Sequence, residues 1–137
     1  MILALPVKHF SGRSLCETLS IPQSYLVQGT KTIFFGGDSG LTEAFRQIGV
    51  SYSIDLAFLP IGNSQPSFFR QLHMSPEDAL EAMEMLQAKR MVPIHWGAFR
   101  LSLESILDPP QRFLNLLITR KINPHAILLQ PGEKIQI

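Results

Sequence analysis

Short apolar runs separated by polar turns recur along the whole chain. Seven of them predict strands, at residues 2–5, 25–27, 31–35, 54–59, 91–94, 127–129 and 135–137. The second and third lie close enough to form a hairpin, and Pro131 and Gly132 separate the last two. The run at 54–59 is apolar throughout rather than alternating, which is typical of a strand covered on both faces.

Helical spacing of apolar residues predicts three helices between these strands. The first carries Leu41, Phe45 and Ile48 on one face and ends at Gly49. The second begins at Ser75, which precedes a proline and two acidic residues, and extends to about Lys89. The third follows two prolines and turns four side chains inward: Phe113, Leu114, Leu117 and Ile118. Strands alternating with helices predict an α/β layer whose middle strands are parallel, within a single domain over residues 1–137.

Composition narrows the class of protein. The chain has 137 residues, 45% hydrophobic and 17% charged, so it must bury a core. A net charge of +1 argues against a nucleic-acid partner held by phosphate neutralisation. Cys16 is the single cysteine, which excludes an internal disulfide or a cysteine zinc cluster. No apolar run approaches the ~20 residues of a membrane span, and no basic leader precedes an apolar one, so we expect a cytoplasmic protein.

Polar side chains able to bind a metal follow several of the predicted strands. Asp38, His73 and His95 each lie in a loop after a strand, and His9 follows the first strand. Loops at the carboxyl ends of parallel strands meet at one edge of the sheet, so these residues are expected to converge there. Imidazole and carboxylate are the ligands of zinc, manganese or iron.

Each of these residues also has a purely structural interpretation. Asp38 would serve as the N-cap of the helix that follows, and His73 would cap or brace the helix that begins two residues later. His95 would pair with the adjacent Trp96 in a half-buried aromatic contact, and His9 would lie on the surface. Spacing alone does not decide between these interpretations and a metal site.

Six segments resemble one family, in the same order along the chain. They are residues 6–13 (PVKHFSGR), 34–40 (FFGGDSG), 55–62 (DLAFLPIG), 73–79 (HMSPEDA), 94–99 (IHWGAF) and 131–133 (PGE). They are similar to the patterns P-x-x-H-[WF]-S-x-R, F-x-G-D-[ST]-G, D-L-A-x-[IL]-P-I-G, H-[MV]-x-P-E-[ED]-A, I-H-W-G-[TA]-F and P-G-E of metallo-β-lactamase-fold hydrolases. The branch they resemble is N-acyl-phosphatidylethanolamine-hydrolysing phospholipase D and its bacterial relatives. The resemblance implies the C-terminal half of a metallo-β-lactamase αββα sandwich.

The resemblance also implies a set of roles at a two-zinc site. His9 would bind the first metal ion, His95 the second, and Asp38 would bridge them, while His73 would lie near the substrate as a proton donor or phosphate contact. Relatives supply four of seven ligands from an upstream H-x-H-x-D-H segment that has no counterpart in this sequence. We therefore expect this chain alone to hold zinc weakly or not at all.

The implied function is a metal-dependent hydrolase that cleaves phosphodiesters, with a small-molecule or phospholipid substrate. The alternatives are an inactive, truncated half-domain and a split enzyme whose other half is a separate polypeptide. In either case an exposed sheet face would require a second copy, a partner chain or the N-terminal half of the family fold. Phe68, Phe69 and the apolar residues of 101–107 belong to the core or, alternatively, line an apolar entrance or contact a membrane surface.

Overall fold

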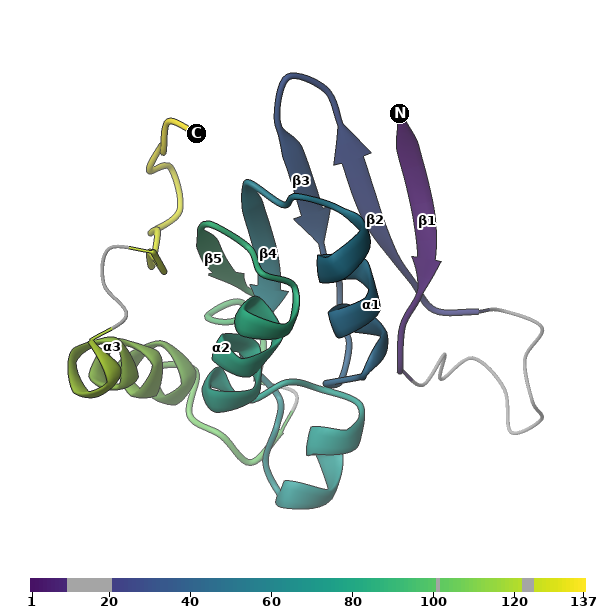
Figure 1. Cartoon of the computed structure of the whole chain (residues 1–137). Helices are drawn as coiled ribbons and strands as arrows, with labels where there is room; N and C mark the ends of the chain where they lie inside the picture. The colour runs from purple at the N-terminus through teal and green to yellow at the C-terminus, as the bar shows by residue number, and fades with distance from the viewer. Residues whose placement is uncertain (10–20, 101, 122–124) are drawn as a thin grey trace.

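The protein forms one five-stranded sheet with helices packed on one of its faces (Figure 1). A computed structural model describes residues 1–9, 21–100, 102–121 and 125–137. Cys16, Leu101 and the part of the 6–13 segment after His9 lie outside these described residues. The strands are β1 (Ile2–Pro6), β2 (Gln23–Gln28), β3 (Thr32–Phe35), β4 (Leu56–Pro60) and β5 (Met91–Ile94).

The strands follow one another across the sheet in chain order. β1, β2 and β3 form an antiparallel meander, and β3, β4 and β5 are parallel. β1 therefore runs in the same direction as β3, β4 and β5, so the carboxyl ends of four strands share one edge. The predicted α/β layer with parallel strands in its middle is confirmed.

The helices are α1 (Ala44–Ser51), the short 3₁₀ helix η1 (Ser67–Gln71), α2 (Pro76–Met85) and α3 (Asp108–Arg120). The predicted start of α2 is confirmed: the Ser75 hydroxyl accepts a hydrogen bond from the Asp78 amide, and the Asp78 carboxylate accepts one from the Ser75 amide. This reciprocal capping satisfies amide groups that the first helical turn leaves free. None of the described helices is both long and apolar enough to cross a bilayer.

Two helix ends differ from the sequence prediction. Gly49 was expected to end α1 but lies inside it. A side chain at this position would overlap the backbone of Met85 and Leu86, at the end of α2. The glycine thus permits close approach of two helices. α2 ends at Met85 rather than Lys89, because Gln87 adopts a left-handed conformation (φ 50°) and the Lys89 amide donates to the Ile54 carbonyl.

The two strands predicted at the end of the chain are not formed. Among the described residues after α3, only Ala126 bridges to β5, through hydrogen bonds from the Met91 amide to the His125 carbonyl and from the Ile127 amide to the Met91 carbonyl. The next residue of β5 that faces this edge is Pro93, which has no amide hydrogen to donate. The ladder therefore stops after one bridge.

α3 buries a narrower face than its sequence predicts. Phe113 and Leu117 are buried as expected, whereas Leu114 and Ile118 are exposed. The principal helix contact of α3 is with α2, and one partner covers only one stripe of a helix. Phe68 is also exposed, so it does not belong to the core in this structure.

The face of the sheet opposite the helices carries exposed apolar side chains. Leu26 and Phe34 point toward the helices and are fully buried, and Phe34 contacts Phe45 of α1. Their neighbours alternate to the other side, where Ile2 pairs with Val27 and Tyr25 pairs with Phe35. We call these four exposed side chains the open sheet face.

Candidate metal centre

Four side chains predicted from the sequence meet at the carboxyl edge of the sheet. His9 follows β1, Asp38 follows β3, His95 follows β5, and His73 lies between η1 and α2. Because β1, β3 and β5 run in the same direction, their following loops emerge together. The predicted convergence of these residues is therefore found in the structure.

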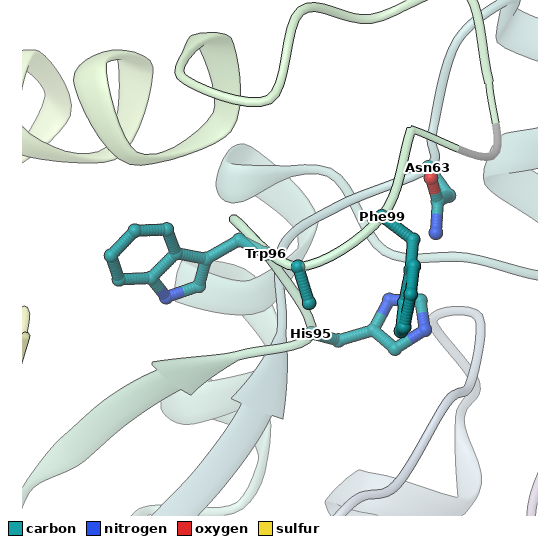
Figure 2. A pocket seen from close by; sticks show the side chains of 5 residues that line it. Asn63, His95, Trp96 and Phe99 are labelled. Carbon is teal, nitrogen blue, oxygen red and sulfur yellow. The ribbon is translucent and has the colours of Figure 1, made fainter. Parts of the chain in front are cut away.

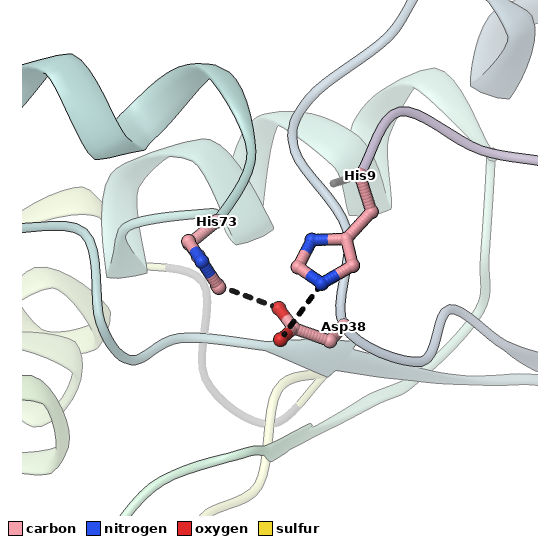
Figure 3. Close-up of side chains that lie close together, drawn as sticks. All are labelled: His9, Asp38 and His73. Atoms are coloured by element: carbon pink, nitrogen blue, oxygen red, sulfur yellow. Dashed lines mark hydrogen bonds and ion pairs between the residues drawn. The ribbon is translucent and has the colours of Figure 1, made fainter. Parts of the chain in front are cut away.

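The Asp38 carboxylate lies at the centre of the group (Figure 3). Its Oδ1 is 2.7 Å from His73 Nδ1, and its Oδ2 is 3.4 Å from His9 Nε2 and 3.2 Å from His95 Nε2. The His73 ring stacks on the His95 ring at a centroid distance of 6.0 Å and meets the His9 ring edge-on at 5.0 Å. One carboxylate thus contacts three imidazoles.

Backbone hydrogen bonds hold the three loops of the site together. The Gly40 amide donates to the Lys8 carbonyl (2.8 Å), which fixes the loop of His9 against that of Asp38. The Met74 amide donates to the Ser39 carbonyl (3.0 Å), which fixes the loop of His73 in the same way. A side chain at position 40 would overlap the backbone carbonyl of Gln71, so only glycine permits this approach.

Two of the imidazoles have their orientation set by the backbone. His9 Nδ1 lies 3.1 Å from the Leu72 carbonyl oxygen, which turns its Nε2 toward Asp38. A second hydrogen bond of this kind is the usual device for orienting a histidine ligand. His95 has a positive φ of 60°, a conformation that costs energy in residues other than glycine and is often found at functional sites.

The charges of the group favour an ionised carboxylate. Burial opposes ionisation of Asp38, but hydrogen bonding and attraction from His73 and His95 outweigh it and hold the pKa of Asp38 well below its ordinary value. The hydrogen bond to Asp38 raises the pKa of His95, against the effect of burial. Asp38 is therefore an anion over the physiological pH range.

Neither Asp38 nor His73 caps a helix, so the capping interpretations of these two residues are wrong. Glu43, not Asp38, occupies the N-cap position of α1, and Ser75 caps α2. The Trp96 indole donates to the Pro93 carbonyl instead of pairing with its neighbour. His125, the remaining histidine of the chain, is exposed and distant from the group, with Nδ1 beside the Lys89 carbonyl.

The donor set fits a divalent metal ion. One nitrogen each from His9 and His73 and a carboxylate oxygen of Asp38 lie within 4.8 Å of one another, and His95 Nε2 contacts the same carboxylate. Nitrogen and oxygen ligands in this combination suit zinc and related transition metals. The individual roles assigned to the four residues stay predictions.

Residues 1–96 match the Beta-lactamase superfamily domain. The chain is 43% identical over 109 residues to a UPF0173 metal-dependent hydrolase of Geobacillus thermodenitrificans, covering 78% of this chain and 41% of that protein. It is 36% identical over 139 residues to an uncharacterized protein of Mycobacterium tuberculosis, covering 98% of this chain and 37% of that protein. The chain thus spans about half or less of the length of these curated relatives.

Solved structures show the same fold. Igni18, a metallo hydrolase of Ignicoccus hospitalis, superposes with a TM-score of 0.70 at 24% identity, over 98% of this chain and 51% of that one. The isothiocyanate hydrolase of Delia radicum gut bacteria superposes with a TM-score of 0.78 at 15% identity, over 99% and 53%. This chain belongs to the β-lactamase superfamily and has its metallo-β-lactamase fold.

Proposed function

We propose that this chain contributes the Asp38 centre to a metal-dependent hydrolase that cleaves phosphodiesters. The observation that carries the proposal is the contact of one ionised carboxylate with three imidazoles at the carboxyl edge of the sheet. Membership of the superfamily and similarity to proteins named metal-dependent hydrolases support it. The phosphodiester substrate class rests on the resemblance to the phospholipase D branch.

In this proposal zinc is held by His9, Asp38 and His95, with Asp38 as the bridging ligand of a two-ion site. Bound zinc supplies Lewis acidity toward a phosphoryl oxygen and lowers the pKa of water. Asp38 needs no deprotonation to act as a ligand, because its pKa is already low. The Leu72 carbonyl holds His9 with its Nε2 directed at the centre.

His73 has a different part in the proposal. Its Nδ1 is engaged by Asp38 at 2.7 Å, so Nε2 is the ring nitrogen that remains to face a substrate. From there it would donate a proton to the leaving oxygen or a hydrogen bond to the phosphoryl group. The alternative role for His73 is as a metal ligand together with His9 and Asp38.

The complete enzyme is proposed to need more than the residues of this chain. A catalytic zinc takes three protein ligands plus water, and the four side chains here cannot supply that for two ions. The remaining ligands would come from a polypeptide that carries the H-x-H-x-D-H segment, joined to this chain or separate from it. Without it, the chain would be a folded, metal-poor and inactive half.

Hydrolysis of bis(p-nitrophenyl) phosphate in the presence of zinc tests the proposal. We expect turnover when the chain is mixed with an H-x-H-x-D-H polypeptide of the same family, and a loss of at least about a hundredfold in Asp38→Asn. His125→Ala is the matched control and should leave the rate unchanged, because His125 lies away from the centre. Turnover that survives Asp38→Asn, or its absence from every zinc-loaded mixture, would refute the hydrolase assignment.

A further inference from the structure

A small cavity opens beside His95 on the side away from β5 (Figure 2). Its lining consists of Asn63, His95, Trp96, Ala98 and Phe99, and its volume is about 180 Å³. That volume is comparable to the ~150 Å³ of a protein cavity that holds benzene. The cavity is therefore large enough for one ring-sized group next to the candidate metal centre.

The chemistry of the lining favours an uncharged group. None of the five described lining residues is Asp, Glu, Lys or Arg, and the imidazole of His95 is already engaged with Asp38. Arg100 and Glu104 line the adjoining hollow, which shares Asn63, His95, Trp96 and Phe99 with this cavity. Phe99, which is 78% exposed, contributes an aromatic face at the rim, and Asn63 contributes a carboxamide with both donor and acceptor atoms. An aromatic wall and one amide select a planar, neutral group that carries a carbonyl or amide.

The two walls of the cavity come from different loops, which a buried carboxylate joins. Asn63 follows β4, whereas Phe99 lies in the segment that leads from His95 to α3. Glu104 of that segment accepts hydrogen bonds from the Ser64 amide (3.1 Å) and the Ser64 hydroxyl (2.8 Å). The Glu104 side chain is only 4% exposed, so this connection is shielded from water.

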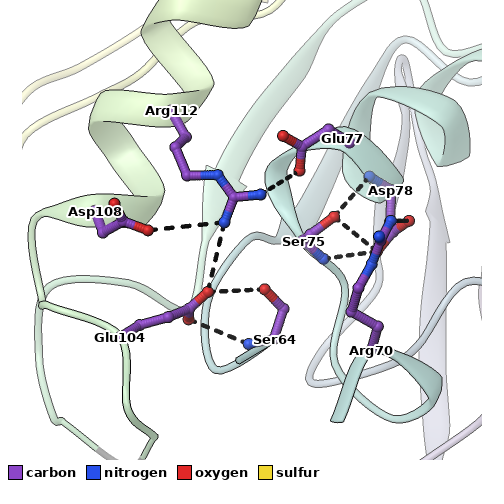
Figure 4. Close-up of polar contacts among 8 residues, drawn as sticks. All are labelled: Ser64, Arg70, Ser75, Glu77, Asp78, Glu104, Asp108 and Arg112. Atoms are coloured by element: carbon purple, nitrogen blue, oxygen red, sulfur yellow. Dashed lines mark hydrogen bonds and ion pairs between the residues drawn. The ribbon is translucent and has the colours of Figure 1, made fainter. Parts of the chain in front are cut away.

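Arg112 extends the connection to the helices (Figure 4). Its guanidinium lies 3.7 Å from Glu104 and 3.7 Å from Asp108, and it donates to Glu77 of α2 at 2.7 Å. A buried carboxylate is stable only when it is paired and hydrogen-bonded, and both conditions are met here. The part of this segment around Glu104, five residues after Phe99, is thereby fixed to α2, α3 and the loop of Asn63.

We propose that Asn63, His95 and Phe99 form a subsite for a neutral, planar group of the substrate, and that Glu104 is the positioning residue that holds its two walls together. The proposal deepens the proposed function, since the subsite adjoins the same centre. It stands on the cavity, its uncharged lining and the Glu104–Ser64 connection. Glu104 does not contact the substrate group; it acts through Asn63 and Phe99.

Benzamide is a suitable probe, with benzoate and benzamidinium as charged molecules of the same shape. Binding is measured by ¹H–¹⁵N NMR on the full chain in the presence of a chelator, so the result is independent of zinc. We expect benzamide to shift the Asn63 side-chain amide and the Phe99 backbone amide, and to bind at least about threefold more tightly than either charged probe. Asn63→Gly, which keeps the left-handed backbone, and Phe99→Ala should each weaken benzamide about three- to tenfold.

The positioning role is tested with Glu104→Ala and, as a milder change, Ser64→Ala. Both should weaken benzamide, and the same spectra should show shifted amides around Asn63 and Phe99; Glu81→Ala, an exposed acid on α2, should do neither. Equal binding of all three probes, or unchanged benzamide affinity in Phe99→Ala, would overturn the subsite. Tight benzamide binding in a folded Glu104→Ala would overturn the positioning role. A zinc titration of Phe99→Ala separates this proposal from that of the metal centre. If zinc still shifts the signals of the histidine rings in this variant, the metal proposal stands even where the subsite fails.

Discussion

The open sheet face leads to a prediction about association of the chain. Val27 is central in this face, between Ile2 on β1 and Ile33 on β3. Replacing it by lysine places a charge among apolar side chains without disturbing the buried face of β2. We expect the wild-type chain to associate through the open sheet face and Val27→Lys to stay monomeric.

The structure sets the magnitude of this effect. Ile2, Tyr25, Val27 and Phe35 are 70%, 41%, 39% and 44% exposed, which together corresponds to about two fully exposed side chains. Covering them contributes about 3–6 kcal/mol per copy, or about 6–12 kcal/mol for two faces. Association itself costs about 4–15 kcal/mol. The most favourable combination of these figures leaves about 8 kcal/mol for association, so the dissociation constant of the dimer is no tighter than about micromolar.

Sedimentation equilibrium at micromolar to millimolar concentrations of the chain measures the effect. The average mass of the wild-type chain should rise with concentration, and Val27→Lys should weaken the association at least about tenfold. Val50→Lys is the control, because Val50 is the same residue type, is 76% exposed and lies on α1, away from the open sheet face. A wild-type chain with one monomer mass at every concentration would refute the reasoning, as would an equal effect of Val50→Lys.

Two further predictions concern the loops and helix that hold the site. Gly40→Ala should lower zinc affinity at least about tenfold, because the added methyl group displaces the Gln71 backbone. A zinc titration checks this against Gly29→Ala, where the added methyl group makes only an ordinary contact with the Lys31 carbonyl oxygen at 4.0 Å. Asp78→Asn should lower the free energy of unfolding by about 1–2 kcal/mol at pH 7, measured by urea denaturation. Burial opposes ionisation of Asp78, but hydrogen bonds from Arg70 and Ser75 outweigh it and lower its pKa. The stability that the carboxylate contributes is complete above its ordinary pKa of 3.8 and is lost as the pH falls through the folded value, so the two proteins should converge in acid. A difference that stays constant down to about pH 2 would contradict this assignment.

The sequence predicted the elements that depend on local chemistry. The apolar run at 54–59 gave β4 within two residues, and Ser75 with Pro76 gave the start of α2 to the residue. It failed where a distant segment decides the outcome. Gly49 is inside a helix because α2 passes close by, and the final strands are lost because Pro93 blocks the facing edge.

For the site, too, the sequence predicted what depends on strand order and missed what depends on contacts with distant segments. The convergence of Asp38 with three histidines followed from strand order, since loops after parallel strands share an edge. The Leu72 carbonyl that orients His9 could not be predicted, because any backbone carbonyl can take that part. Glu104 gave no signal either: an acidic residue in a polar loop is normally exposed, and its burial depends on Ser64 and Arg112 from other elements.

The central claim is that His9, Asp38, His73 and His95 form one metal centre. Long-range ¹H–¹⁵N NMR of the histidine rings during a zinc titration tests it directly, because it detects weak binding and the chain has only four histidines. We predict that the rings of His9, His73 and His95 change together, that His125 does not, and that Asp38→Asn abolishes the response at the same zinc concentration. Shifts confined to His125, or a response of the three rings that survives Asp38→Asn unchanged, would contradict the account.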